Sequence, residues 1–191
     1  IGDAQGRRGS GSTDGATYTA DTPMAIASAS KWLYAAYVAE RRGGAGLGAS
    51  ADVPFLNFSS GYTGFDGCLA GQTVAQCQSY QGVLIRNGGF SAADLGRFHY
   101  SGGHMQKHAV DLSLGAMDNA ALAAEIRSRL GTDIALSYSQ PQLAGGAVST
   151  AADYARFLRK VLRGELKIAG LLGTQALCAS DAACGRVGVA S

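Results

Sequence analysis

The sequence has few charged residues and no long apolar run. Only 16% of its 191 residues are charged, and the formal net charge is +2, whereas an average globular domain is roughly 25% charged. Because no Lys/Arg cluster accompanies this weak charge, we expect no nucleic-acid partner. No apolar run reaches the ~18 residues of a membrane-spanning helix, so we expect no membrane span. The 47% hydrophobic content excludes an intrinsically disordered chain.

Several catalytic and nucleotide-binding motifs are also absent. No Gly-x-Ser-x-Gly occurs, which argues against the nucleophile turn of an α/β-hydrolase. The glycine-rich segment 44–48 follows an expected helix rather than a strand and has no Gly-x-x-x-x-Gly-Lys, so we interpret it as a connection. His104 and His108 have the spacing of a helical zinc pair, but the glutamate and a third ligand are missing. We interpret them as a polar segment and expect neither metal nor cofactor.

Glycine is abundant, and the cysteines form two close pairs. The 28 glycines are about twice the average usage and indicate many loops with close backbone approaches. The pairs are Cys68 with Cys77 and Cys178 with Cys184; their spacing does not fit a zinc site. Four cysteines allow three connectivities, of which pairing of neighbours is the simplest. Two disulfides predict a secreted or periplasmic protein, and buried free thiols are the alternative.

The remaining patterns predict a mainly helical chain with irregular connections. An exposed arm or poorly formed strands are expected over residues 1–22, and mostly loop with short helices over residues 43–90. The best strand candidate is Gly82–Ile85. Helices are expected over Met24–Glu40, from Ser91 to about Phe98, over Ala120–Leu130, over Ala151–Arg163 and around Ile168–Leu177.

Sequence patterns also predict where three of these helices begin or end. Asp118 or Asn119 is expected to cap the helix over Ala120–Leu130, and Thr150 the helix that follows it. The first helix is expected to end at Gly43, after two arginines. Tyr34 and Tyr37, on that first helix, are expected in the core or along a groove.

Ser28 and Lys31 are the first candidate catalytic pair. A serine and a lysine three residues apart lie on one face of a helix, so the hydroxyl and the amine can touch. Serine is a weak nucleophile unless a base takes its proton, and an amine acts as that base when burial lowers its pKa. Chance alone gives about 0.4 Ser-x-x-Lys matches in this composition, so an exposed lysine on an amphipathic helix is the alternative. Lysine is nevertheless rare here, and Lys31 lies in the most apolar helix.

Tyr100 is the second candidate. It precedes Ser101 and the glycine pair Gly102-Gly103. A tyrosine beside a lysine ammonium gains phenolate character and can transfer protons. The alternative is a tyrosine packed at the end of a short helix.

Together, Ser28-x-x-Lys31 and Tyr100-Ser101-Gly102 resemble the first two motifs of serine hydrolases related to penicillin-binding proteins. The resemblance is to the branch of class C β-lactamases, DD-peptidases of the same shape and β-lactamase-like esterases. Phe58–Tyr62 resembles the Thr-Ser-Gly loop of that branch, with serine in place of threonine. Leu143–Leu158 resembles its glycine-pair turn leading into a surface helix.

The resemblance implies an α/β (α+β) fold in which a helical lobe packs on an antiparallel-sheet lobe. Residues 1–191 would form one catalytic region, with residues 23–191 as the mainly helical portion. The resemblance also implies an acyl-enzyme on Ser28, with Lys31 and Tyr100 sharing the proton transfers. Ser101, Gly102 and Gly103 are then expected at the substrate, which would be a small or short oligomeric ester or amide.

Two departures from the family pattern bear on the substrate and on the sheet. Gly102 stands where the family usually has an asparagine that holds a peptide or β-lactam carbonyl, which favours an ester or an unusual amide. A third motif, Lys-Thr-Gly or His-x-Gly, does not follow Tyr100, so the remaining strands are expected in a second chain or a C-terminal fragment of the same protein. DD-peptidase or β-lactamase activity is one alternative. A non-catalytic ligand-binding or sensor domain on the same scaffold is the other.

Overall fold

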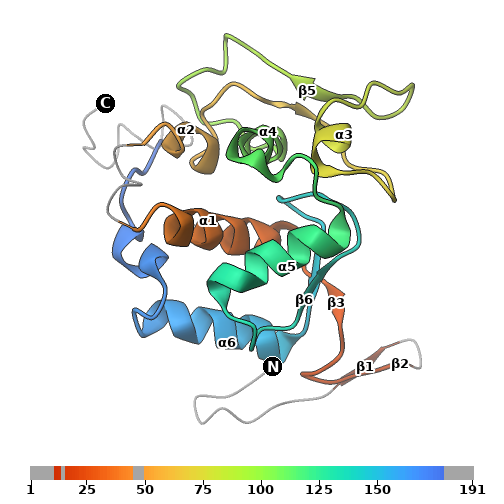
Figure 1. The fold of residues 1–191 in the computed structure, drawn as a ribbon, viewed down its shortest axis with the longest axis vertical. Coiled ribbons are helices and arrows are strands. Elements are labelled where there is room, and N and C mark those ends of the chain that lie inside the picture. The colour runs from red at the N-terminus through yellow and green to blue at the C-terminus, as the bar shows by residue number, and fades with distance from the viewer. Residues whose placement is uncertain (1–10, 14–15, 45–49, 179–191) are drawn as a thin grey trace.

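A computed structural model describes residues 11–13, 16–44 and 50–178 (Figure 1). Among these residues the chain forms six α-helices and three small antiparallel sheets, which confirms a mixed α+β fold. The elements, in chain order, are β1 (Gly11–Thr13), β2 (Ala16–Tyr18), β3 (Met24–Ala25), α1 (Ser30–Arg41), α2 (Val53–Leu56), β4 (Gly64–Phe65), α3 (Val74–Gln78), β5 (Asn87–Gly89), α4 (Gly103–Ala109), α5 (Asn119–Leu130), β6 (Leu136–Tyr138), β7 (Ala147–Ser149) and α6 (Ala151–Leu162).

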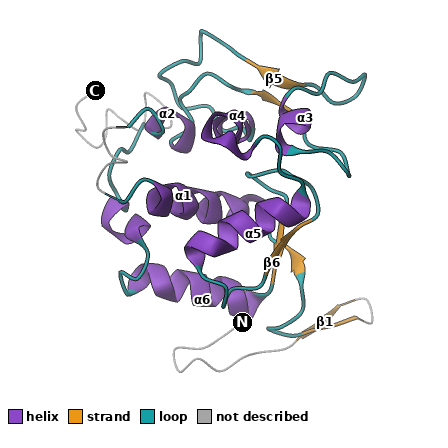
Figure 2. Ribbon diagram, in the orientation of Figure 1, coloured by secondary structure: helices purple, strands orange, loops and turns teal. Residues whose placement is uncertain are grey.

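The strands are short, and the helices dominate the architecture (Figure 2). The largest sheet has three strands in the order β3-β7-β6, with Ser149 of β7 opposite Met24 on one side and Leu136 on the other. β1 pairs with β2, within the expected N-terminal arm, and β4 pairs with β5. No helix among the described residues combines the length and the apolar character that crossing a membrane requires.

Helix α1 forms the centre of the core. Figure 1 shows it crossing the middle of the molecule, with α4 on one side and α6 on the other. It packs against α5 and against the 3₁₀ turn Lys167–Leu171. Tyr34 and Tyr37 are fully buried, which confirms their expected place in the core. Their neighbours in the apolar core come from α4, α5, β6, β7 and α6.

The helices predicted from strong local caps are confirmed. The Asp118 carboxylate accepts a hydrogen bond from the backbone N–H of Ala121, and the Thr150 hydroxyl accepts one from that of Asp153. Gly131 and Gly164 follow the two helices with positive φ angles of 120° and 71°. These contacts are local in sequence, which is why sequence patterns can identify them.

The first helix begins six residues later than predicted. Met24–Ala25 pair with β7 as strand β3, a 3₁₀ turn covers Ala27–Ala29, and α1 starts at Ser30. The pairing of Met24–Ala25 with a strand more than a hundred residues away leaves no pattern in the local sequence. A helix predicted from periodicity alone therefore starts too early. The helix ends as expected, before Gly43 with a φ of 78°.

Two other predicted elements are wrong and one is shorter. Residues 91–98 form turns rather than a helix, and the Asp94 carboxylate accepts a hydrogen bond from Thr63 of a neighbouring loop at 3.1 Å. Gly82–Ile85 is not a strand but the tip of a turn closed by the bridge between Gln81 and Arg86. Of the helix expected around Ile168–Leu177, only the 3₁₀ turn Lys167–Leu171 is present.

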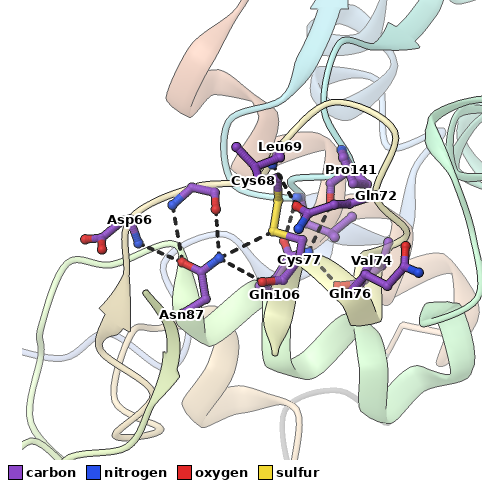
Figure 3. Close-up of a disulfide and its surroundings, with 12 residues drawn as sticks. Asp66, Cys68, Leu69, Gln72, Val74, Gln76, Cys77, Asn87, Gln106 and Pro141 are labelled. Atoms are coloured by element: carbon purple, nitrogen blue, oxygen red, sulfur yellow. Dashed lines mark hydrogen bonds between the residues drawn. A yellow bond between two sulfur atoms is a disulfide. The ribbon is translucent and has the colours of Figure 1, made fainter. Parts of the chain in front are cut away.

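A disulfide joins Cys68 and Cys77, as neighbour pairing predicts (Figure 3). Beside it, the Asn87 amide donates to the carbonyls of Gly67 and Cys77, both at 2.7 Å. The carbonyl of the same amide accepts from the backbone N–H of Asp66 at 2.9 Å. These bonds and the disulfide together tie β5 to the loop after β4. Cys178 is also disulfide-bonded, whereas Cys184 lies outside the described residues.

Candidate active site

Ser28 and Lys31 face each other at the junction of β3 and α1. The Lys31 Nζ donates a hydrogen bond to the Ser28 Oγ at 3.0 Å and a second one to the backbone carbonyl of Ala144 at 2.8 Å. Ser28 is exposed and Lys31 is half-buried. The contact predicted from the spacing is therefore present, although a 3₁₀ turn rather than a continuous α-helix supplies it.

The backbone immediately before the serine is strained. Ala27 has a φ of +44°, a left-handed conformation that non-glycine residues rarely adopt. The Ser30 hydroxyl donates to the Ala27 carbonyl at 2.6 Å and accepts from the Ala147 N–H at 3.3 Å. The Ala147 carbonyl in turn accepts from the Ile26 N–H at 3.0 Å. Strain of this kind persists only where surrounding contacts fix it, and it concentrates at functional sites.

The glycine-pair turn presents the second acceptor of Lys31. Ala144 lies in this turn, directly before Gly145-Gly146. A Cβ on Gly146 would lie 2.3 Å from the Gln140 carbonyl oxygen, so the turn requires glycine there. The sequence predicts the turn, and the structure adds its role, which is to aim the Ala144 carbonyl at the lysine.

Tyr100 completes the cluster from a distant part of the chain. The Lys31 Nζ lies 4.7 Å from the centroid of the Tyr100 ring. Hydrogen bonds with Ser28 and, secondarily, with Lys31 lower the pKa of the Tyr100 hydroxyl below its usual value. The side chain is 57% exposed, so it is open to a ligand from solvent. The structure thus brings together the three residues that the sequence proposes as catalytic.

Two side chains hold the Tyr100 loop in place. The Phe58 ring lies 5.2 Å from the Tyr100 ring, and the Phe58 carbonyl accepts from the His99 N–H at 2.9 Å. His104 is fully buried, and burial lowers its pKa, so the ring is neutral. Its Nε2 contacts the His99 carbonyl at 2.8 Å and therefore carries the proton, so its Nδ1 accepts from the Ser60 hydroxyl at 2.7 Å.

The residues after Tyr100 are packed rather than open. The Ser101 hydroxyl donates to the Thr63 carbonyl at 2.8 Å and accepts from the Gly103 N–H at 3.2 Å. A Cβ on Gly102 would lie 3.0 Å from the Phe65 ring, and one on Gly103 would lie 2.5 Å from a backbone oxygen. Packing therefore explains both glycines. Contact of these three residues with substrate stays a prediction.

His108 belongs to a buried polar network, not to a polar surface segment. Burial lowers its pKa, so the ring is neutral. Its Nε2 donates to the Asp52 carboxylate at 2.9 Å, and its Nδ1 accepts from the Tyr34 hydroxyl at 3.0 Å. Arg42 donates two hydrogen bonds to the same carboxylate, at 2.6 and 2.8 Å. His104 and His108 thus lie on α4 beside the Tyr100 loop, where both are buried and bonded to polar partners from distant segments.

The described residues contain no group of three or more side chains suited to a metal ion. A cavity of about 400 Å³ instead opens beside Lys31, between α1, α2, α4 and residues 168–175. Of the residues that the structure describes, Lys31 is the one charged residue in its wall. No sequence pattern indicates this cavity, because its walls come from four separate segments.

Comparison with protein-family models, curated proteins and solved structures finds no match to this chain. Its function is therefore inferred from the geometry of the site.

Proposed function

We propose that the protein is a serine hydrolase that cleaves a carboxylic ester or an unusual amide through an acyl-enzyme on Ser28. The observation that carries the proposal is the cluster itself. An exposed serine hydroxyl lies 3.0 Å from a lysine amine, and the ring of Tyr100 lies 4.7 Å from the same amine. A nucleophile within hydrogen-bond reach of a base, with a second proton carrier beside it, is the arrangement that acyl transfer requires.

In acylation, Lys31 acts as the base and takes the Ser28 proton while the Oγ forms a bond to the substrate carbonyl carbon. Negative charge develops on the carbonyl oxygen, where the Ser28 backbone N–H in the first helical turn supplies a donor. The bond to the leaving group then breaks. Tyr100 gives its proton to that group and regains one from the Lys31 ammonium.

In deacylation, the Tyr100 hydroxyl takes a proton from a water molecule and passes its own proton to Lys31, while the water oxygen attacks the acyl carbon. The bond between the acyl carbon and Ser28 breaks, and the proton returns from Lys31 to the serine oxygen. The acid product leaves, and the three residues regain their starting protonation.

The packing at Gly102 favours an ester over a peptide or β-lactam. A glycine offers no side-chain amide to hold such a carbonyl, and Phe65 and Ala144 occupy the space into which a side chain would extend. We further propose that the helices belong to the helical lobe of a β-lactamase-like fold. The Cys68–Cys77 disulfide supports a secreted or periplasmic location.

Steady-state turnover tests the proposal. Purified protein is assayed with p-nitrophenyl butyrate, a D-amino-acid amide, a D-Ala-D-Ala peptide and nitrocefin. We expect sustained ester hydrolysis that Ser28→Ala abolishes and that the exposed-strand control Ser137→Ala retains. Hydrolysis of nitrocefin or the peptide in preference to the ester would contradict the ester assignment. A single stoichiometric burst without turnover would instead support a non-catalytic sensor.

A further inference from the structure

We infer that the cavity beside Lys31 binds the unbranched hydrocarbon part of the substrate, so that the preferred substrates are medium-chain rather than short-chain esters. This inference rests on the proposed function for its catalytic consequence. The binding of the hydrocarbon chain itself is argued from the residues that line the cavity.

The cavity walls are almost entirely apolar. Trp32 and Ala35 line it from α1, one and four residues after the proposed base, and Met105 lines it from α4. Its volume of about 400 Å³ lies within the range of small-molecule sites. The other apolar lining residues are Val53, Leu56, Phe58, Ile168, Leu171 and Leu172.

Two of the polar lining residues, Asn57 and Thr174, have hydrogen-bond partners within the protein. The Asn57 side-chain oxygen accepts from the Ser59 hydroxyl at 2.8 Å, and the Thr174 hydroxyl donates to the Leu171 carbonyl at 2.7 Å. Among the described residues, no arginine lines the cavity, so Lys31 is the one cationic partner that this part of the chain offers a ligand carboxylate there. A chain of methylene groups matches such a wall because its burial needs no hydrogen bonds.

The cavity borders the candidate catalytic cluster at two of its lining residues. Lys31 lines it and bonds to the Ser28 hydroxyl, while Phe58 lines it and packs on the Tyr100 ring. A hydrocarbon chain in the cavity therefore lies against Lys31 and Phe58, the two residues that contact the serine and the tyrosine. The same geometry lets the carboxylate of a free fatty acid, the hydrolysis product, pair with the Lys31 ammonium.

Substrate chain length tests the catalytic consequence. Each methylene that enters an apolar site contributes about fourfold in binding. We therefore expect kcat/KM for p-nitrophenyl octanoate to exceed that for the butyrate at least tenfold. A parallel series of alkyl acetates shows whether the acyl or the alcohol part enters. A flat profile in both series would overturn the inference while leaving the hydrolase proposal intact.

Filling the cavity should remove the preference. Ala35→Phe places a ring in the cavity, and Leu172→Asp places a charge on its exposed wall. Both should bring the octanoate-to-butyrate ratio of kcat/KM to within about threefold of unity. Ala124→Phe, the same change at an exposed position of α5, is the matched control and should keep the ratio. An unchanged ratio in folded Ala35→Phe and Leu172→Asp would contradict the inference.

Trp32, the one tryptophan of the sequence, provides a test that needs no turnover. Octanoate brominated at its terminal carbon quenches a tryptophan only at close contact. In Ser28→Ala we expect saturable quenching of Trp32, competed by plain octanoate and lost when Ala35→Phe is added. Absence of quenching would refute the binding site. Quenching together with a complete lack of ester turnover would refute the hydrolase proposal and keep the site.

Discussion

Replacing Lys31 with alanine should abolish most of the activity while leaving the fold intact. The substitution removes the amine that lies 3.0 Å from the Ser28 Oγ, and general base catalysis contributes typically 10²- to 10⁴-fold. We therefore expect kcat/KM for p-nitrophenyl butyrate to fall by that factor, which corresponds to about 2.7–5.5 kcal/mol of transition-state stabilisation. Steady-state kinetics on purified protein measures the loss.

The effect on stability should be smaller, because Lys31 is half-buried and its hydrogen bond to Ala144 is one bond to a charged group. We expect a loss of about 1–3 kcal/mol in the free energy of unfolding, measured by urea denaturation. Lys107→Ala, another lysine on a helix, is the control and should retain activity. Lys31→Arg keeps the charge but cannot act as a base, so it should be as inactive as Lys31→Ala. Near-wild-type turnover in either Lys31 variant would refute the assignment of lysine as the base.

Three further predictions concern the same neighbourhood. Tyr100→Phe keeps the ring over Lys31 but removes the hydroxyl, so kcat should fall by roughly 10²-fold or more, whereas Tyr18→Phe should have the wild-type rate in the same assay. Burial alone would raise the pKa of Asp52, but hydrogen bonds from Arg42 and other partners outweigh burial and hold the pKa below its usual value. The stability that the ionised carboxylate contributes is therefore present at neutral pH and lost as the pH falls below about 4. Asp52→Ala should lower the free energy of unfolding by about 3–5 kcal/mol at pH 7 and weaken its dependence on acid pH, measured by urea denaturation. Equal acid sensitivity of the wild type and the variant would contradict this prediction. Gly102→Asn should overpack against Phe65, costing about 1–3 kcal/mol by urea denaturation, without creating nitrocefin hydrolysis; an unchanged midpoint would show that the ring moves freely.

The contact between Ser28 and Lys31 could be predicted from sequence because its geometry is local. Ser28 and Lys31 are three residues apart, so the 3₁₀ turn leading into α1 places their side chains on one face. The caps at Asp118 and Thr150 are local for the same reason. Tyr100 could be proposed only from its motif, since its place beside Lys31 depends on tertiary packing through Phe58.

The features that sequence reasoning missed all depend on distant partners. Strand β3 exists because β7 pairs with it, and the left-handed Ala27 follows from the contacts between those segments. His104 and His108 have the same local pattern as surface histidines, and only Ser60 and Asp52 from remote loops make them core residues. The cavity likewise arises from α1, α2, α4 and residues 168–175 meeting in space.

The central claim is that Ser28 is a nucleophile activated by Lys31, and covalent labelling tests it most directly. The folded protein is treated with a fluorophosphonate, and the site of the adduct is mapped by mass spectrometry of proteolytic peptides. We predict one adduct per chain, located on Ser28, formed by the control Lys107→Ala at the wild-type rate and strongly slowed in Lys31→Ala. A folded, unlabelled protein, or an adduct on any other serine, would contradict the claim.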